Sequence, residues 1–190
     1  IDLNSRLKGK VNGQVINFYR MKISFFQVAA EEERELGFVI TDNNGKAVFN
    51  VKDDSLKTDA EGKLSFKAVF TGNKAMEAVE EVVAMKKARL EITPLKEDSI
   101  LSILVKLLDE GSGTETPIKD ATVGIFVKRL FLPLKVGEGT TDENGEVTIE
   151  FPNNLPGDKN GNLSIIGRLD ENEIYGNLEA SSVQKWGVPI

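Results

Sequence analysis

Apolar and polar residues alternate over short stretches in the second half of the chain. Leu101, Ile103, Val105 and Leu107 occupy every second position of one such stretch. Alternation with period two is typical of a strand that buries one face. Glycine, asparagine, aspartate and proline separate these stretches, as they do in all-β sandwiches. The pattern therefore predicts an all-β fold, with strands expected at residues 101–107, 123–127, 147–151 and 163–169.

The first half of the chain repeats this pattern one hundred positions earlier. Residues 41–46 read Thr-Asp-Asn-Asn-Gly-Lys, and residues 141–146 read Thr-Asp-Glu-Asn-Gly-Glu. After a one-residue gap, residues 59–65 match residues 158–164, and the apolar positions of the strands keep the same phase. A long fixed period indicates tandem copies of one folding unit. We therefore expect two tandem β-sandwich domains that fill their cores with equivalent side chains.

Pro94 marks the expected boundary between the two copies. Proline cannot donate a hydrogen bond to a strand ladder, and the charged residues 96–98 follow it. We therefore place the first domain at residues 1–95 and the second at residues 96–190. Because the linker is short and is not a Gly/Ser-rich tether, we expect the sandwiches to pack end to end as a semi-rigid rod.

Two segments of the first copy are rich in helix-forming residues. They are residues 29–35 and 76–88. Their partners in the second copy are poor helix sequences, since residues 129–135 contain a proline and residues 175–187 end in Trp-Gly. Two copies of one unit should share a fold, so we predict strand and loop in both segments.

The composition removes most catalytic chemistry. The chain has no cysteine and no histidine. It therefore lacks a thiol nucleophile, the usual zinc ligands and the serine–histidine pair. We expect no enzymatic activity and no cofactor. The net charge of −6, without a Lys/Arg cluster interleaved with aromatics, also argues against nucleic acid as a partner.

No stretch of the sequence predicts a membrane span. The longest apolar stretch, Ile100–Leu108, is far shorter than the ~20 residues needed to cross a bilayer. The chain begins at Ile1 rather than at methionine, which we interpret as a mature or excised fragment whose signal peptide or anchor has been removed. A fragment with a tag before Ile1 would begin in the same way. We expect membrane contact only through an anchor outside this fragment.

The repeated Thr-Asp-x-Asn-Gly segment admits two interpretations. Carboxylate and amide oxygens are calcium ligands, but neither copy has the spacing of an EF-hand loop. We favour a turn in which the aspartate caps the backbone and Asn-Gly supplies positive φ angles. The acidic residues 170–173 beside Tyr175 similarly suggest a cation or sugar site, and we favour a solvated loop tip there.

An apolar segment of the second copy has no apolar counterpart in the first. It contains Leu130, Phe131, Leu132 and Leu134, whereas the first copy has an acidic stretch at residues 31–33. Consecutive apolar residues of a strand or corner cannot all face one core. The segment either packs against the first domain or bends across the second core, or it forms a docking patch for another protein. These four residues are the candidate partner-binding site.

The segment from Gly137 to Ile149, Gly-x-x-Thr-Thr-Asp-x-Asn-Gly-x-x-x-Ile, resembles the central signature of bacterial Ig-like repeats. It is also similar to invasin/intimin-type domains and to transthyretin-like and prealbumin-like modules, which carry a segment like residues 117–123 before their second strand. The resemblance implies Ig-like or transthyretin-like sandwiches in a periplasmic or cell-surface protein of a Gram-negative bacterium. It implies spacer, adhesion or ligand-display roles and no catalytic residues.

The sequence thus favours a non-catalytic ectodomain module of an exported, membrane-anchored protein. Its expected role is that of a spacer, adhesion or protein-binding scaffold, with protein rather than glycan or calcium as its partner. The alternative is a carbohydrate- or metal-sensing accessory module of an enzyme or transporter. The shortage of aromatics beyond the phenylalanines, which leaves only Tyr19, Tyr175 and Trp186, disfavours glycan binding. A third hypothesis is a sandwich enzyme that uses carboxylates alone.

Overall fold

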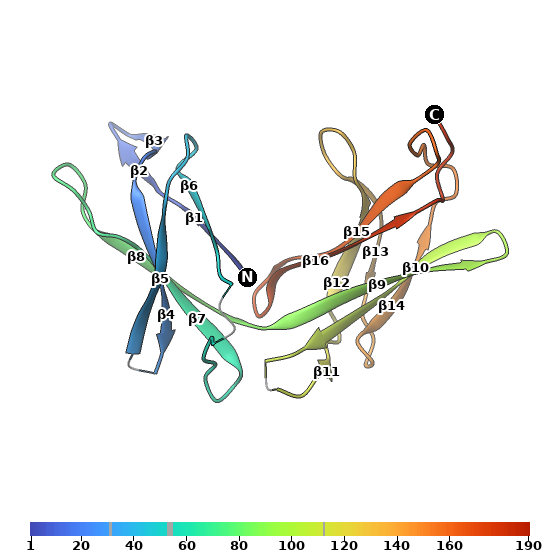
Figure 1. Cartoon of the computed structure of the whole chain (residues 1–190), viewed down its shortest axis with the longest axis horizontal. Coiled ribbons are helices and arrows are strands. Elements are labelled where there is room, and N and C mark those ends of the chain that lie inside the picture. Colours follow the sequence, from blue (N-terminus) through green and yellow to red (C-terminus); the bar gives the residue numbers. More distant parts are fainter. Residues whose placement is uncertain (31, 53–54, 112) are drawn as a thin grey trace. The chain divides into compact units, whose positions relative to one another are not determined.

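The computed structural model describes residues 1–30, 32–52, 55–111 and 113–190, and these residues form strands and loops without a helix. The chain divides into two compact units, Ile1–Met85 and Lys86–Ile190. Each unit packs antiparallel sheets face to face around its own core (Figure 1). The predicted all-β fold with two tandem sandwich domains is confirmed.

The second unit is a complete sandwich. In one sheet, β10 lies at the centre, with β9 along one edge and β14 and the short β11 along the other. The other sheet has the strand order β13-β12-β15-β16. The strands are β9 (Ala88–Glu97), β10 (Ile100–Asp109), β11 (Thr116–Pro117), β12 (Thr122–Val127), β13 (Leu134–Thr140), β14 (Glu146–Phe151), β15 (Leu163–Asn172) and β16 (Gly176–Gln184).

The predicted alternation sets the core of the second unit. Every second residue of β10, β12 and β15 faces inward and is buried, as period-two strands require. Leu90 and Ile92 of β9 pack closely over Gly167, where a Cβ atom would lie 2.6 Å from Ile92 Cγ2. Glycine at this position therefore allows β9 to approach the opposite sheet. The buried apolar residues are Leu90, Leu101, Ile103, Val105, Leu107, Ile118, Ala121, Val123, Ile125, Val127, Ile149, Phe151, Leu163, Ile165 and Leu169.

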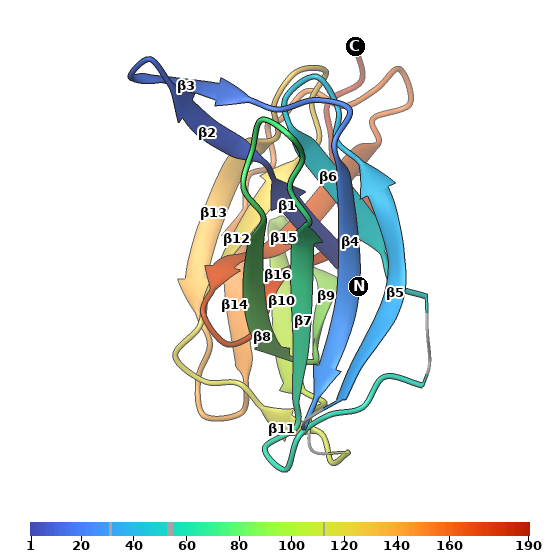
Figure 2. The ribbon, with the colours of Figure 1, turned by 90° about the vertical axis from the view of Figure 1, so that its left-hand side faces the viewer.

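The first unit has the same plan, with a smaller second sheet. Its four-stranded sheet, in the order β5-β4-β7-β8, is seen face-on in Figure 2. In the described part of the chain, its facing sheet consists of β1 and β6. Strands β2 and β3 form a hairpin that corresponds to the end of β10 and β11. The strands are β1 (Asp2–Arg6), β2 (Lys8–Val11), β3 (Gln14–Asn17), β4 (Lys22–Ala29), β5 (Glu32–Ile40), β6 (Lys46–Asn50), β7 (Lys63–Phe70) and β8 (Val79–Lys86).

The core of the first unit is aromatic where that of the second is aliphatic. Phe25 stacks on Phe49 with 5.2 Å between ring centroids, and Phe66 is fully buried. The equivalent positions in the second unit are Ile125, Ile149 and Ile165. The buried apolar residues of the first unit are Leu3, Ile23, Phe25, Ala47, Val51, Leu64, Phe66 and Phe70.

The boundary between the units differs from the expected division at residues 95 and 96. The structure divides the chain between Met85 and Lys86, and Pro94 lies inside β9 rather than after the last strand of the first unit. Pro94 pairs with Ile103 on the edge of the sheet. An edge strand tolerates proline because its outward backbone positions have no ladder partner to lose. Proline therefore marked an edge strand and not a linker.

The segments rich in helix formers are strands, as the repeat predicted. Residues 32–40 form β5 and residues 79–86 form β8, while Glu31 lies outside the described residues. Tertiary pairing overrides helix propensity here, since each strand completes an edge of the four-stranded sheet.

Candidate functional site

A buried threonine anchors the same turn in both units. The side chain of Thr141 is nearly inaccessible, and its hydroxyl donates to the Ile118 carbonyl at 2.7 Å and accepts from the Ala121 amide at 3.1 Å. In the first unit, the Thr41 hydroxyl makes the same two bonds at 2.7 and 3.0 Å. Each threonine thereby ties the loop before one strand to the loop after the next.

The aspartate that follows each threonine closes a turn by backbone contacts. Asp142 Oδ1 accepts the amides of Asn144 at 2.8 Å and Glu146 at 3.0 Å. These two backbone hydrogen bonds hold the pKa of the exposed Asp142 carboxyl below its usual value, since they favour the charged form. Asp42 makes the equivalent bonds and its pKa is lowered for the same reason. The turn interpretation of the repeated motif is confirmed.

One detail of the expected turn is wrong. Gly45 and Gly145 have φ angles of 69° and 72°, but Asn44 and Asn144 are not in the left-handed region. The glycine amide donates to the aspartate carbonyl three residues earlier, which is the bond of a type I turn followed by a left-handed residue. Asparagine therefore lies within the turn, and glycine alone supplies its positive φ.

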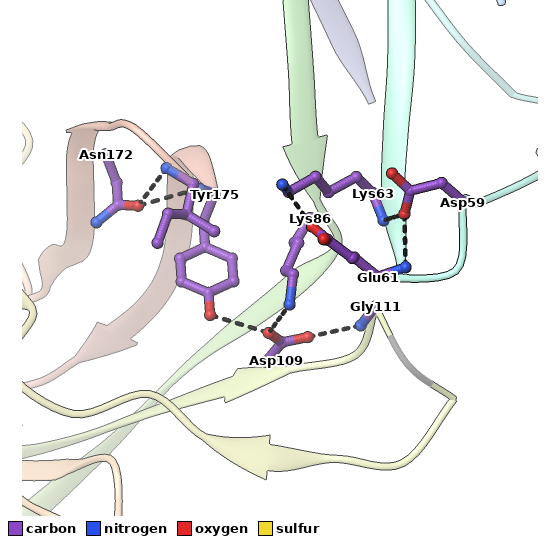
Figure 3. Close-up of polar contacts among 9 residues, drawn as sticks. Asp59, Glu61, Lys63, Lys86, Asp109, Gly111, Asn172 and Tyr175 are labelled. Carbon is purple, nitrogen blue, oxygen red and sulfur yellow. Dashed lines mark hydrogen bonds and ion pairs between the residues drawn. The ribbon is translucent and has the colours of Figure 1, made fainter. Parts of the chain in front are cut away.

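The same capped turn occurs once more in each unit. Asp59 Oδ1 accepts the amides of Glu61 and Lys63, both at 2.8 Å (Figure 3). Asp158 repeats this pattern ninety-nine positions later, and backbone and side-chain bonds from Asn162 lower its pKa. Four aspartates are thus occupied in holding turns. Among the described residues, no group of three or more acidic side chains is arranged to hold a metal ion.

Sequence analysis did not predict a polar cluster in the second unit. The buried carboxylate of Asp109 accepts from the Tyr175 hydroxyl at 2.9 Å and lies 3.7 Å from Lys86 Nζ (Figure 3). Its other oxygen accepts the Gly111 amide at 2.8 Å. Burial and the Asp109 carboxylate raise the pKa of Tyr175 to about 12, so the phenol stays protonated and donates. The cluster joins the ends of β8 and β10 to the loop after β15. Sequence analysis could not predict it, because its residues are far apart in the chain.

In the acidic segment beside Tyr175, an asparagine side chain holds the turn by bonding to the backbone. Asn172 Oδ1 accepts the amides of Ile174 and Tyr175, both at 3.0 Å, and the side chains of Asp170, Glu171 and Glu173 are exposed. The loop is a solvated tip between β15 and β16, as the sequence favoured.

The four residues of the candidate partner-binding site lie together at one hairpin. They occupy the loop between β12 and β13 and the first residue of β13. Leu130 and Phe131 are each 90% exposed, Leu132 is 79% exposed and Leu134 is 44% exposed. We call these four residues the apolar tip. Glu31, the first-copy counterpart of Phe131, lies outside the described residues. The apolar tip does not bend across the second core, so that part of the sequence expectation is wrong.

Substitution of the apolar tip distinguishes the two remaining interpretations. We expect the combined change Leu130→Ser, Phe131→Ser and Leu132→Ser to alter the free energy of unfolding by no more than about 0.5 kcal/mol, because these side chains are solvated in their own unit. Urea unfolding monitored by Trp186 fluorescence measures it. A loss above about 1 kcal/mol would instead indicate that the tip packs against the first unit.

No protein-family model and no curated protein match this chain. Among solved structures, the chain is similar to one described as the crystal structure of a tetra-tandem repeat in the extending region of a large adhesion protein. The TM-score is 0.38 and the sequence identity is 11%, over 97% of this chain and 49% of that one. The chain thus spans about half the length of that structure, and so distant a likeness assigns no function.

The described residues also contain no helix with the length and apolarity to cross a membrane.

Proposed function

We propose that this chain is a non-catalytic tandem-repeat module of an exported, surface-associated protein. It acts as a spacer that holds a protein-binding hairpin at a set distance. The sandwiches belong to the Ig-like or transthyretin-like class whose turn signature the sequence resembles. In this proposal the protein carries its anchor outside the fragment and works at the bacterial surface or in the periplasm.

One observation carries the spacer proposal. Strand β8 ends at Lys86 and β9 begins at Ala88, so Lys87 alone lies between the last strand of one sandwich and the first strand of the next. A connection of one residue between two paired strands has little conformational freedom compared with a flexible tether. Both sandwiches repeat the same turns, while no reactive side chain is shared between the copies. The two copies therefore share their structural turns and do not share a set of reactive side chains.

The apolar tip supports the protein-binding part of the proposal. Large exposed apolar side chains gathered on one loop are typical of protein interaction sites. The first unit has the acidic residues Glu32 and Glu33 near the corresponding hairpin. The two copies therefore share a scaffold and differ at a loop, as expected when a repeated scaffold displays variable loops.

A distance measurement between the units tests the spacer proposal. The chain has no native cysteine, so Glu35→Cys and Glu150→Cys place one exposed spin label in each unit. Pulsed electron–electron double resonance should give a single narrow distribution of distances between the two labels, because a one-residue connection restricts the motion of one sandwich relative to the other. Insertion of about eight Gly/Ser residues at Lys87 is the control and should broaden the distribution. An unmodified chain as broad as the insertion variant would contradict the spacer role.

A further inference from the structure

The first unit carries a row of cations on the outer face of β1 and of the β2–β3 hairpin, which projects from the end of this unit (Figure 2). From residue 3 to residue 10, the odd-numbered residues are buried or half-buried and the even-numbered residues are exposed. The alternation of β1 therefore continues through Leu7 into β2. Lys46 of β6 lies directly opposite Arg6 and is also exposed. We call the cations on this side the basic face; they are Arg6, Lys8, Lys10 and Lys46.

The second unit has an ion pair where the first has two cations. Lys106 lies opposite Glu146, with 2.9 Å between Lys106 Nζ and Glu146 Oε1. The first unit keeps the cation as Arg6 but has Lys46 in place of the glutamate. Like charges directly opposite each other destabilise an antiparallel pair. The first unit therefore holds a destabilising arrangement at a position where the other copy has a stabilising one.

The other two cations are also particular to the first unit. Lys8 and Lys10 correspond to Leu108 and Glu110 of the second unit. The basic face thus collects four cations at positions where the other copy has one cation, two acids and a leucine. This concentration of positive charge occurs in a chain whose net charge is −6.

The acidic groups near the basic face are engaged elsewhere. Asp42 Oδ1 accepts two backbone amides, and these bonds first, and the charges of Lys46 and Arg6 after them, lower the pKa of Asp42. Asp2, two residues before Asn4 on β1, accepts a hydrogen bond from the Asn50 side chain. In the described part of the chain, no side chain of the basic face takes part in an ion pair. The face therefore keeps a net positive charge.

Two exposed valines lie at the ends of the basic face. Val48 lies opposite Asn4, one step before Arg6, and Val15 lies opposite Lys10 at the other end. Val48 is 43% exposed and Val15 is 61% exposed. Residues on one face of a strand recur every ~6.7 Å, so the row from Val48 to Val15 is about 20 Å long. Its order is apolar, cationic, apolar.

We propose that the basic face binds an extended acidic segment of a partner protein. The segment lies along β1 and β2 with an acidic residue at every second position, so that its carboxylates recur with the same period as the cations. An aliphatic residue at each end of the segment contacts Val48 or Val15. This surface is separate from the apolar tip, so the inference goes beyond the proposed function.

The residues between the cations favour a polypeptide over a nucleic acid. Single-stranded nucleic acids are held by aromatic side chains on which their bases stack. The remaining residues of the row are Asn4, Asn17 and the two valines, with Asn17 opposite Lys8. Amide and aliphatic side chains suit an extended peptide, whose polar and aliphatic groups alternate in the same way.

Two peptides of equal composition test the spacing. In Val-Thr-Glu-Thr-Glu-Thr-Glu-Thr-Val the carboxylates share one side of the extended peptide, whereas in Val-Thr-Thr-Glu-Glu-Glu-Thr-Thr-Val they alternate sides. With the full chain at low ionic strength, the first peptide should bind about fivefold more tightly, because the second turns one carboxylate away and an exposed ion pair contributes up to that factor. Titration followed by the amide NMR signals gives both the dissociation constants and the location, and added salt should weaken binding.

Lys46→Glu separates binding from folding. It recreates the arrangement of Lys106 and Glu146, so the melting temperature of the first unit should rise by about 2–4 °C. Affinity for the alternating peptide should fall about tenfold, because one attraction is replaced by a repulsion. Calorimetry gives the melting temperature; the transition of the first unit is the one that fluorescence of Trp186, in the second unit, does not follow.

Two further variants are controls. Lys159→Glu makes the same change in net charge at an exposed position of the second unit, and it should leave the affinity within about twofold. Glu146→Lys places like charges opposite each other in the second unit, and it should lower the melting temperature of that unit by a similar amount to the rise in the first.

Four results would overturn the proposal. The first is equal affinity for the two peptides, or the absence of amide shifts at the basic face with either. The second is unchanged peptide affinity in the Lys46→Glu variant. The third is equally tight binding of a single-stranded oligonucleotide with the charge of the peptide. The fourth is salt-dependent self-association that shifts the same amides without peptide, which would assign the basic face to a second copy of the chain.

Discussion

Replacing Thr141 with valine is expected to destabilise the second unit by about 2–4 kcal/mol, because the change leaves two buried backbone groups without a partner. The Thr141 hydroxyl serves both the Ile118 carbonyl and the Ala121 amide, and valine has the same shape without that hydroxyl. Shape is conserved, so the loss reports hydrogen bonding rather than a cavity. Urea unfolding monitored by Trp186 fluorescence measures the free energy, since Trp186 packs against Phe151 in the core of this unit.

Thr140→Val is the matched control. Thr140 is the preceding residue, and its exposed hydroxyl lies 3.3 Å from that of Thr122. We expect a change within about 0.5 kcal/mol there. Thr41→Val should destabilise the first unit for the same reason as Thr141→Val destabilises the second. Equal effects of the Thr140 and Thr141 variants would show that the buried hydroxyl is not the anchor of the turn.

Gly145→Ala should cost about 2–4 kcal/mol, because it combines backbone strain with a steric clash. The φ angle of Gly145 is 72°, and a Cβ atom would lie 2.5 Å from the Leu107 carbonyl oxygen and 3.0 Å from the Ile118 amide nitrogen. Both atoms belong to backbone and cannot rotate away. A fall in the urea midpoint of the second unit, at unchanged slope, is the expected observation.

Gly176→Ala separates the two contributions. Gly176 has a φ angle of 67°, but no atom lies within 4 Å of its added Cβ. We expect a loss of about 1 kcal/mol, from the left-handed conformation alone. The difference between the two variants gives the cost of the close approach between the turn and β10. If Gly145→Ala cost no more than Gly176→Ala, the turn would have room to move away from the strand.

The strands and the turns could be predicted from the sequence because both depend on neighbouring residues. Period-two burial follows from the geometry of each strand by itself, and the alternation at residues 101–107 marks β10 correctly. Each capped turn is made by an aspartate and the residues two to four positions after it. The hundred-residue repeat then carried these assignments to β5 and β8, where propensity alone indicates a helix.

Only the tertiary structure decided which edges are paired and which side chains are covered. Asp109 and Tyr175 are separated by 66 positions, and no local pattern brings them together. Pro94 reads as a boundary until its pairing with Ile103 shows an edge strand. The exposure of the apolar tip is likewise set by the fold around it and not by its own sequence. A strand's own residues set the alternation of its side chains, but its pairing partners come from distant segments brought together by folding. Local sequence therefore does not show whether an edge of a strand is paired or unpaired.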